Sequence, residues 1–418
     1  MDFAQKILTD PINKWVFDHS PKETYLVGGY IRDLLRGELP GDKDFVLKGD
    51  AEKTAKKAAR MFGGKFIELQ NKQTFRVALK GRRFIDFSLL NNTIMEDLQS
   101  RDFTMNAIAW SPASGILSPD NYQDDIIKRV VRHVKAQNLL DDSLRILRAY
   151  RLAAQLDFEI IIDTRALLKK YSKLINSAAP ERTTEELFKL LNCNNAFNYI
   201  QLCADDKVLS RLLSLTFDNI AINLLSLNIF DTILQKHLSS DKNLHLHNYL
   251  NGEISQGLNK YGFIRLYLLL RKYDKNENRI CCKETVSDLV HKKSMLRMST
   301  RIRKSLYAIE KAELMFSGRM TDSRLYQIFK NAGDCIYEAA ILLSIMKPGS
   351  YTRIIKKAEE FLYTRDNTLV NGTDIKTILG IKSGRAIGKI KDRVLENQFR
   401  GNVRNRREAR EFIMRNFT

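Results

Sequence analysis

The first third of the chain has the pattern of a small mixed α/β unit. Short apolar runs, several of them broken by glycine, alternate with polar turns and one amphipathic segment, which is typical of strands packed around a helix. The pattern predicts strands at residues 24–27, 42–47, 66–69, 75–79 and 83–87 and a helix at residues 50–62.

The pattern changes near residue 135. From there to about residue 370, glycine becomes sparse and apolar residues recur at i, i+3 and i+4, the spacing of one helix face. This predicts helices at residues 139–156, 184–191 and 338–346. Strands followed by a long helical region indicate an α+β fold or separate domains, and 418 residues are too many for one compact domain.

The charge balance of the chain indicates a class of binding partner. The 69 Lys and Arg residues exceed the 49 Asp and Glu residues, which gives a formal net charge of +20. Such a surplus favours a polyanionic partner such as nucleic acid, although a well-solvated basic surface has the same composition. A membrane partner is not predicted, because the start lacks a signal-like apolar core and no run of about 18 apolar residues occurs.

The cysteines and histidines do not predict a metal or disulfide site. An odd number of cysteines without a C-x-x-C pair argues against a disulfide framework and a cysteine zinc site, and fits a reducing cytoplasm. They are Cys193, Cys203, Cys281, Cys282 and Cys335. His245 and His247 follow a helical pattern, so they fall on different helix faces and are interpreted as ordinary residues.

The first chemical motif is a glycine pair at the end of a predicted strand. Gly28 and Gly29 directly precede a helical segment that contains Arg32. Glycine lets the backbone approach a ligand closely, and a helix N-terminus aims amide groups at an anion. The turn is therefore a candidate phosphate site, with an ordinary Gly-Gly turn as the alternative.

An acidic pair lies a short way downstream. In a strand, Asp42 and Asp44 point to one face and Lys43 to the other. Two carboxylates this close repel each other, so a compensating divalent cation is expected, and hard oxygen ligands suit Mg²⁺. A solvated Asp-rich turn after Pro40 and Gly41 is the alternative interpretation.

Five motifs in a fixed order carry a family resemblance. They are Gly28-Gly29-x-x-Arg32-Asp33 through Asp42-x-Asp44, Arg101-Asp102-Phe103-Thr104-Met105-Asn106-Ala107, Asp141-Asp142-Ser143-Leu144-Arg145-Ile146-Leu147-Arg148-Ala149-Tyr150-Arg151, Glu181-Arg182 with Glu186-Leu187, and Asn371-Gly372-Thr373-Asp374 through Gly388. Together they resemble class II tRNA nucleotidyltransferases, the family of CCA-adding enzymes and bacterial poly(A) polymerases. The motifs are dense over residues 24–191, thin over 206–340 and return at 369–412.

The resemblance implies an α+β fold. A small mixed-sheet, polymerase-β-like nucleotidyltransferase head would precede an elongated, all-helical neck, body and tail. The expected boundaries are residues 1–135 for the head, 136–205 for the neck with a nucleobase-template helix, 206–345 for the body and 346–418 for a basic tail that binds tRNA.

The resemblance also implies metal ligands. Asp42 and Asp44 would be catalytic and would hold two Mg²⁺ ions that activate the RNA 3′-hydroxyl and neutralise the triphosphate. Asp86 is either a third ligand or a plain strand-edge aspartate.

Further residues are implied to bind the nucleotide. These are Gly28, Gly29, Arg32, Asp33, Arg101, Asp102, Asn106, Asp142, Arg145, Arg148 and Arg151. The glycine pair with the first arginine would cradle the triphosphate, and Asp102 with Asn106 would meet the ribose. Asp142 and Arg145, three apart on one helix face, would read the amino group and ring nitrogen of cytosine or adenine.

Each of these assignments has a structural alternative. The template-helix arginines also suit a salt-bridged face, and Asp33 also suits a residue that orients Arg32. In the tail, helical spacing would place Arg400, Arg404 and Arg407 on one face for RNA phosphates, or simply in solvent.

Departures from the family pattern narrow the activity. Ser100 replaces the usual arginine before the RDFT motif, and Asp141 replaces the usual glutamate. Only residues 88–100 separate the last predicted strand from that motif, where complete CCA-adding members carry a longer flexible loop that is thought to reposition the template for ATP. The CC-adding branch lacks this loop too.

We therefore expect a cytoplasmic enzyme that adds the two cytidines of the CCA end from CTP, releases pyrophosphate and stops. The expected partner is tRNA, through its acceptor arm and 3′ end, with no membrane or protein partner. The alternatives are a complete CCA-adding or A-adding enzyme that also uses ATP, a poly(A) polymerase, and a non-catalytic RNA-binding protein.

Overall fold

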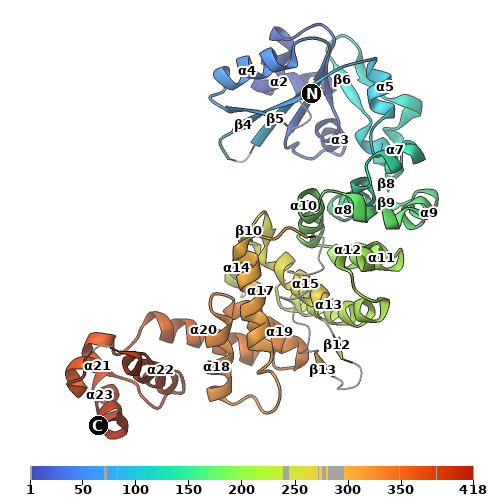
Figure 1. The fold of residues 1–418 in the computed structure, drawn as a ribbon. Helices are drawn as coiled ribbons and strands as arrows, with labels where there is room; N and C mark the ends of the chain where they lie inside the picture. The colour runs from blue at the N-terminus through green and yellow to red at the C-terminus, as the bar shows by residue number, and fades with distance from the viewer. Residues whose placement is uncertain are drawn as a thin grey trace. The chain divides into compact units, whose positions relative to one another are not determined.

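The computed structural model describes the chain except for residues 1, 70–72, 82, 239–243, 272, 275–278, 281–295, 348, 383 and 418. Cys281 and Cys282 therefore lie outside the described residues. The chain forms two compact units, Met1–Leu212 and Leu213–Thr418 (Figure 1).

The first unit is built on a seven-stranded sheet in the order β3-β4-β5-β2-β1-β6-β7. Strands β2 and β5 pair in parallel, and the other neighbouring strands are antiparallel. The strands are β1 (Thr24–Val27), β2 (Lys43–Leu47), β3 (Lys65–Glu68), β4 (Thr74–Leu79), β5 (Arg83–Leu89), β6 (Ala109–Ser111) and β7 (Gly115–Leu117). The mixed sheet confirms the predicted α+β head, and the predicted strand ends differ by at most two residues.

The residues of β2 alternate between two environments. Phe17 of helix α2 (Pro11–His19) contacts the ring of Phe45 edge-on, and Lys43 pairs with Asp10 at 3.0 Å on the same side of the sheet. Asp44 points to the opposite side of the sheet, as the period-two pattern predicts.

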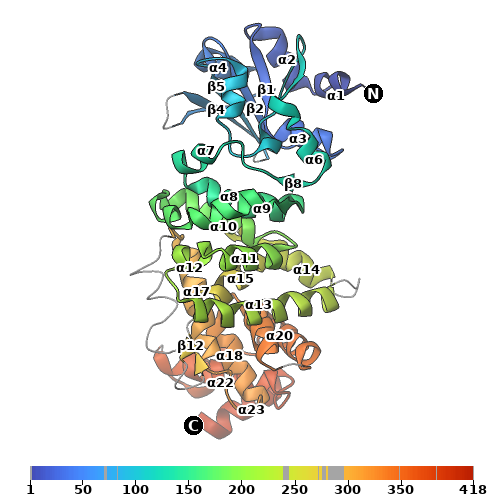
Figure 2. The same ribbon diagram turned by 90° about the vertical axis from the view of Figure 1, so that its right-hand side faces the viewer.

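Helices surround the sheet and complete the first unit. Helix α4 packs against β4 and β5, and α8 packs against α10 and α11 (Figure 2). The helices and short ladder strands are α1 (Phe3–Leu8), α3 (Gly29–Leu35), α4 (Ala51–Met61), α5 (Ile94–Gln99), η1 (Thr104–Asn106), η2 (Pro119–Asn121), α6 (Asp124–Ile127), β8 (Val130–Val131), α7 (Ala136–Asp141), α8 (Leu144–Leu156), β9 (Glu159–Ile160), α9 (Ile162–Lys170), η3 (Ser172–Ser177), α10 (Pro180–Leu191), α11 (Ala196–Asp205) and α12 (Val208–Leu213).

The prediction of one continuous helix over residues 139–156 is wrong. Helix α7 ends at Asp141, and Asp142 adopts an extended conformation with φ −138° and ψ 97°. The Asp142 Oδ1 atom accepts the N–H of Leu144 at 3.1 Å, a local side-chain bond that competes with helix formation. A separate helix, α8, then begins.

The second unit is almost entirely helical. Its elements are α13 (Phe217–Leu238), α14 (Leu244–Asn251), β10 (Glu253–Ser255), β11 (Leu258–Asn259), α15 (Lys260–Leu270), β12 (Tyr273–Asp274), β13 (Arg279–Ile280), α17 (Thr300–Glu313), α18 (Asp322–Ala332), α19 (Ile336–Met346), α20 (Tyr351–Asp366), α21 (Gly372–Leu379), α22 (Arg385–Phe399) and α23 (Arg406–Phe417). His245 and His247 both lie in α14, and the described residues contain no cluster of His, Cys, Asp and Glu arranged for a metal ion.

Helix α13 is the one described helix that is long and apolar enough to cross a membrane. It nevertheless carries polar groups that are matched inside this unit. Buried Asn223 donates to the carbonyl oxygens of Leu269 and Arg271 at 2.9 and 2.8 Å, and Asp231 pairs with Arg265 at 3.0 Å. These contacts assign α13 to the helical core.

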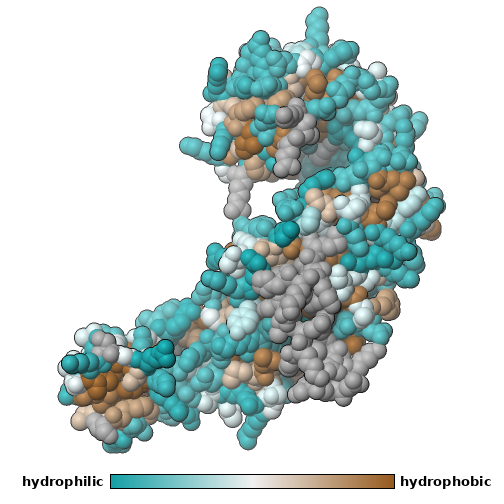
Figure 3. Space-filling model, in the orientation of Figure 1, coloured by the Kyte–Doolittle hydropathy of each residue, from teal (hydrophilic) through white to brown (hydrophobic). Residues whose placement is uncertain are grey.

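The tail helices α21, α22 and α23 share a small apolar core that includes Ile375, Val394 and Ile413. Figure 3 shows apolar side chains gathered at the lower left, over these helices, among mostly hydrophilic neighbours. The small core ties three short helices together, so the tail is not one continuous helix.

The tail arginines do not share one helix face, so that prediction is wrong. Arg400 ends α22, Arg404 lies in the following loop, and Arg407 belongs to α23. Gly401 has φ +78°, a left-handed conformation that ends the helix.

Candidate active site

A cavity of about 650 Å³ lies within the first unit. Its lining includes both predicted catalytic aspartates and all of the predicted nucleotide-binding residues. They are Gly28, Gly29, Arg32, Asp33, Asp42, Asp44, Arg101, Asp102, Asn106, Asp142, Arg145, Arg148 and Arg151. Asp86 is not part of the lining.

The glycine turn is shaped by steric limits. Gly28 caps α3 with φ +71°, and its N–H donates to the carbonyl oxygen of Ile108 at 2.9 Å. A Cβ atom at Gly28 would lie 3.1 Å from Nη1 of Arg101. The turn therefore needs glycine both for its backbone conformation and for its space.

Arg32 is held rigidly beside this turn. Its Nε and Nη2 atoms donate to Asp33 at 2.9 and 3.0 Å, and its Nη1 donates to Oδ1 of Asn106 at 2.7 Å. Asp33 thus orients Arg32, and the guanidinium retains N–H groups that can meet a phosphate.

The acidic pair faces the same cavity. Partial burial raises the pKa of Asp44 to about 6, with Asp86 and Asp42 adding repulsion and Arg101 opposing it. Oδ1 of Asp42 accepts the backbone N–H of Phe84 at 2.9 Å. The crowded negative charge at Asp42 and Asp44 is the environment expected of ligands for a hard divalent cation.

Asp86 is engaged by a neighbour instead. It lies in register with Asp44 on the adjacent strand, and its two oxygens accept from Nε and Nη2 of Arg76 at 2.8 and 2.7 Å. No motif indicated Arg76. Of these three aspartates, Asp42 and Asp44 line the cavity and Asp86 does not.

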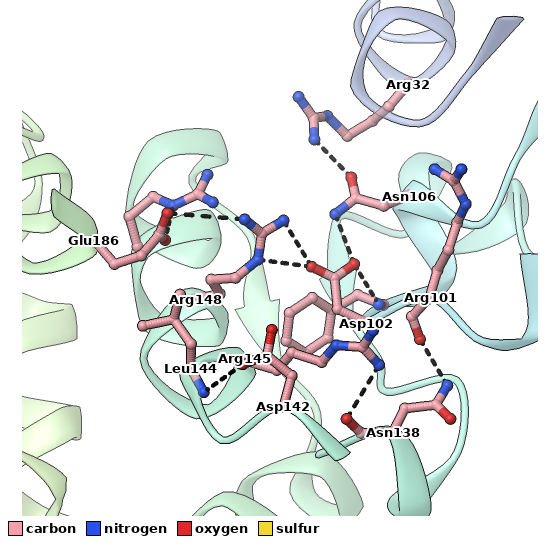
Figure 4. Close-up of polar contacts among 12 residues, drawn as sticks. Arg32, Arg101, Asp102, Asn106, Asn138, Asp142, Leu144, Arg145, Arg148 and Glu186 are labelled. Atoms are coloured by element: carbon pink, nitrogen blue, oxygen red, sulfur yellow. Dashed lines mark hydrogen bonds and ion pairs between the residues drawn. The ribbon is translucent and has the colours of Figure 1, made fainter. Parts of the chain in front are cut away.

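Asp102 is the centre of a polar network (Figure 4). Oδ1 accepts from the Phe103 N–H at 2.8 Å and from Asn106 at 3.1 Å, while Oδ2 accepts from Nε and Nη2 of Arg148, each at 2.9 Å. Burial alone would raise the pKa of Asp102, but Arg148 and the hydrogen bonds hold it below its usual value. Both oxygens of this carboxylate are thus engaged by protein groups.

The network continues into the template helix. Glu186 of α10 accepts from Nε of Arg151 at 2.8 Å and lies 3.8 Å from Arg148. Burial opposes ionisation of Glu186, yet Arg151 and Arg148 keep its pKa below the usual value. Two of the predicted nucleotide-binding arginines are therefore also salt-bridged, a partnership that the sequence pattern alone could not assign.

Asp142 and Arg145 reach the cavity by different routes. Asp142, outside the helix, accepts from Nη2 of Arg182 at 2.8 Å. Arg145, inside α8, donates to the carbonyl oxygens of Ser100 and Asn138 at 2.9 and 3.1 Å. The prediction of one shared helix face is wrong, although both side chains line the same space.

Comparisons with known proteins match this arrangement. Residues 24–132 match the model of the poly(A) polymerase head domain, and residues 157–218 match a model described as the probable RNA- and SrmB-binding site of polymerase A. Both matched segments lie within the first 218 residues, which therefore resemble these two poly(A) polymerase domains.

Curated proteins that are similar to this chain are named as tRNA nucleotidyltransferases. A CC-adding tRNA nucleotidyltransferase of Geobacter sulfurreducens is 39% identical over 186 residues, which cover 44% of this chain and 43% of that protein. One of Thermus thermophilus is 35% identical over 178 residues, 41% of each chain. The match thus spans less than half the length of these curated relatives.

Solved structures share the fold over nearly the whole chain. The Thermotoga maritima CCA-adding enzyme in complex with tRNA has a TM-score of 0.72 at 24% identity, covering 99% of this chain and 98% of that one. A CCA-adding enzyme complexed with CTP has a TM-score of 0.71 at 24% identity, covering 100% of this chain and 95% of that one.

Proposed function

We propose that this chain transfers CMP from CTP to the 3′ end of tRNA and releases pyrophosphate. The supporting observation is that the glycine turn, the acidic pair and the base-reading residues Asp142 and Arg145 all line one cavity. The RNA 3′-oxygen forms a bond to the α-phosphorus, the bond to the β-phosphate oxygen breaks, and the hydroxyl proton passes to water.

Nucleotide binding is divided between two parts of the cavity. Gly28 and Arg32 take the triphosphate, and Asp142 accepts a hydrogen from the amino group of the base while Arg145 donates to the ring nitrogen. Guanine and uracil offer the opposite polarity at these positions, which excludes them.

Asp42 and Asp44 would hold the two Mg²⁺ ions. When bound, such ions neutralise the triphosphate and lower the pKa of the RNA 3′-hydroxyl. The fit rests on the two crowded carboxylates. No third His, Cys, Asp or Glu completes a cluster in the described part of the chain, so the nucleotide and water would supply the remaining ligands.

Asp102 serves this reaction as a positioning residue. Its oxygens are used by Phe103, Asn106 and Arg148, so the ribose would meet the second N–H of Asn106 rather than this carboxylate. Asp102 then fixes the groups around the sugar.

The short segment between β5 and α5 supports a product that ends at CC. Strand β5 ends at Leu89 and helix α5 begins at Ile94, so residues 90–93 are all that joins them. Nothing in that segment has the length of the loop that the resemblance associates with ATP use. Relatives named CC-adding enzymes agree with this reading.

The helical regions complete the proposal. The neck of residues 136–205, the body of 206–345 and the tail of 346–418 would hold the acceptor arm of tRNA, with Arg400, Arg404 and Arg407 at phosphates. The cytoplasm is the proposed compartment, and Cys193, Cys203 and Cys335 are free thiols.

One assay tests the activity and its end point. The purified chain is incubated with a tRNA that ends at the discriminator base, with CTP and labelled ATP. We expect two CMP residues and no AMP. Efficient AMP incorporation contradicts the CC-only product, and absence of any CMP incorporation contradicts the transferase itself. Addition of A to a tRNA that already ends in CC, or long tails on unstructured RNA, would identify the A-adding and poly(A) alternatives.

A further inference from the structure

The second unit contains a cavity of about 670 Å³ that none of the sequence motifs explains. Its walls come from α14, β10 and the first residues of α15, α17 and α19. Cavities of roughly 300–1,000 Å³ are typical of sites for small organic ligands. A ligand of nucleotide size therefore fits.

Three cationic side chains line this cavity. They are Lys260, Arg301 and Lys304, and the last two lie three residues apart on one face of α17. Among the described residues, none of the three lies within salt-bridge distance of a carboxylate, although Glu253 and Asp334 also line the space. Cations grouped around a cavity in this way attract a phosphate group.

The floor of the cavity has a different chemistry. Glu338 is 1% exposed, and its two oxygens accept from the Tyr249 hydroxyl at 3.2 and 3.0 Å. Burial raises the pKa of Glu338 to about 7, so the floor loses much of its negative charge near neutral pH. A half-protonated carboxyl can both accept and donate hydrogen bonds.

The remaining lining is mixed, with the acidic Glu253 and Asp334 and the hydroxyls of Thr300 and Ser305 beside an aromatic and apolar part. The Lys260 ammonium lies 3.2 Å from the centroid of the Tyr249 ring, and Ile254, Ala308 and Ala332 also line the space. The cavity thus combines a cationic rim, an apolar wall and a buried hydrogen-bonding floor. These three features match the phosphate, the ring face and the polar edge of one nucleotide.

We propose that this cavity binds a nucleoside phosphate, with the phosphate at Lys260, Arg301 and Lys304 and the base toward Glu338 and Tyr249. The ligand is either a free nucleotide or one nucleotide of a bound RNA. This site is separate from the first-unit cavity, and the inference does not rest on the proposed transferase activity.

The test counts labelled CTP bound to the full chain by equilibrium dialysis without RNA. Arg145→Ala weakens the first-unit site, so that the second site is observed alone. Arg301→Ala with Lys304→Ala is expected to weaken this remaining binding at least tenfold. The matched control, Arg303→Ala with Lys311→Ala, removes the same charge from the same helix at positions outside the cavity lining and should change the affinity less than twofold.

A second arm identifies the source of the nucleotide. If free CTP does not bind in the Arg145→Ala chain, a tRNA transcript is titrated instead, and the cavity pair should weaken its binding at least fivefold more than the control pair. Circular dichroism and thermal unfolding of each variant verify folding. The proposal is overturned if the cavity pair and the control pair of substitutions weaken binding equally. It is also overturned if the cavity pair weakens the binding of neither CTP nor tRNA.

Discussion

The two cavities have nearly equal volumes, about 650 and 670 Å³, but opposite arrangements of charge. In the first unit, Arg32, Arg148 and Arg151 are each fixed by a carboxylate before any ligand arrives. In the second unit, Arg301 and Lys304 form no ion pair among the described residues, and Lys260 lies over the Tyr249 ring and interacts electrostatically with Glu338. The first is preorganised for chemistry, whereas the second is suited to capture, which shows that cavity size alone does not indicate a role.

The largest expected effect concerns the acidic pair of the first cavity. Asp44→Asn should reduce CMP incorporation by about 10³-fold or more, because the metal-ligand charge is lost. Asp18→Asn removes the same charge from an exposed position on α2 and should leave incorporation unchanged. Tritium-labelled CTP incorporation measures both. Retention of a tenth of the activity by Asp44→Asn would contradict the assignment.

The buried acid of the second cavity should make stability depend on pH. The pKa of Glu338 is raised to about 7 in the folded chain by burial, from an ordinary 4.5, so folding favours its protonated form. The contribution of Glu338 to stability is therefore fully present below about pH 4.5 and declines by about 3 kcal/mol as the pH rises to about 7.

Urea unfolding at several pH values checks this prediction. Glu338→Gln should flatten the decline, while Glu359→Gln, at an exposed position on α20, should preserve it. Tyr249, Lys260 and Asp334 also face this carboxyl and remain unchanged in both variants. An identical decline in the two variants would rule out Glu338 as its source.

The ion pairs of the first cavity should differ in strength with burial. Arg148→Ala leaves Asp102 buried without two of its hydrogen bonds, and should lower the free energy of unfolding by about 2 kcal/mol. This is less than the 3–5 kcal/mol of a fully buried pair, because the Arg148 side chain is 33% exposed.

Arg182 supplies the comparison for that measurement. The Arg182 side chain, which pairs with Asp142, is 57% exposed. Arg182→Ala should therefore lower the free energy of unfolding by only about 0–1 kcal/mol. Urea unfolding measures both variants at one pH. Equal costs would mean that burial does not separate the two pairs.

Alanine substitutions at two glycines can distinguish the effect of backbone strain from the effect of losing the phosphate-binding turn. Gly28 and Gly37 both have positive φ angles, +71° and +78°, which residues with a side chain rarely adopt, so alanine at either should cost roughly 1 kcal/mol or more. Only at Gly28 would a Cβ atom meet Arg101, while nothing lies within 4 Å of one at Gly37. Gly28→Ala should therefore also raise the KM for CTP about tenfold, and Gly37→Ala should not. A normal KM in Gly28→Ala would exclude the turn from nucleotide binding.

The sequence predicted the parts of the first cavity that depend on local pattern. Alternation along β2 placed Asp44 opposite Lys43, and the glycine pair correctly marked a strand-to-helix turn. The break at Asp142 was missed because a single side-chain hydrogen bond outweighed an apolar period that runs through it.

Other partnerships join distant segments and leave no local signal. Arg76 of β4 pairs with Asp86 of the neighbouring strand β5, and the second cavity draws its lining from separate helices without a motif. The prediction that the tail arginines share one helix face was wrong for a related reason. The conformation of Gly401 decides where α22 ends. Such features depend on how separate segments pack against one another. They do not depend on the spacing of residues within one segment.

The network around Asp102 has a consequence for how RNA is captured. Arg32, Arg148 and Arg151 are balanced by Asp33, Asp102 and Glu186, so their long-range fields largely cancel. These arginines therefore contribute little to the rate at which RNA encounters the chain. That rate depends on the rest of the +20 charge, so encounter and chemistry can be changed by separate substitutions.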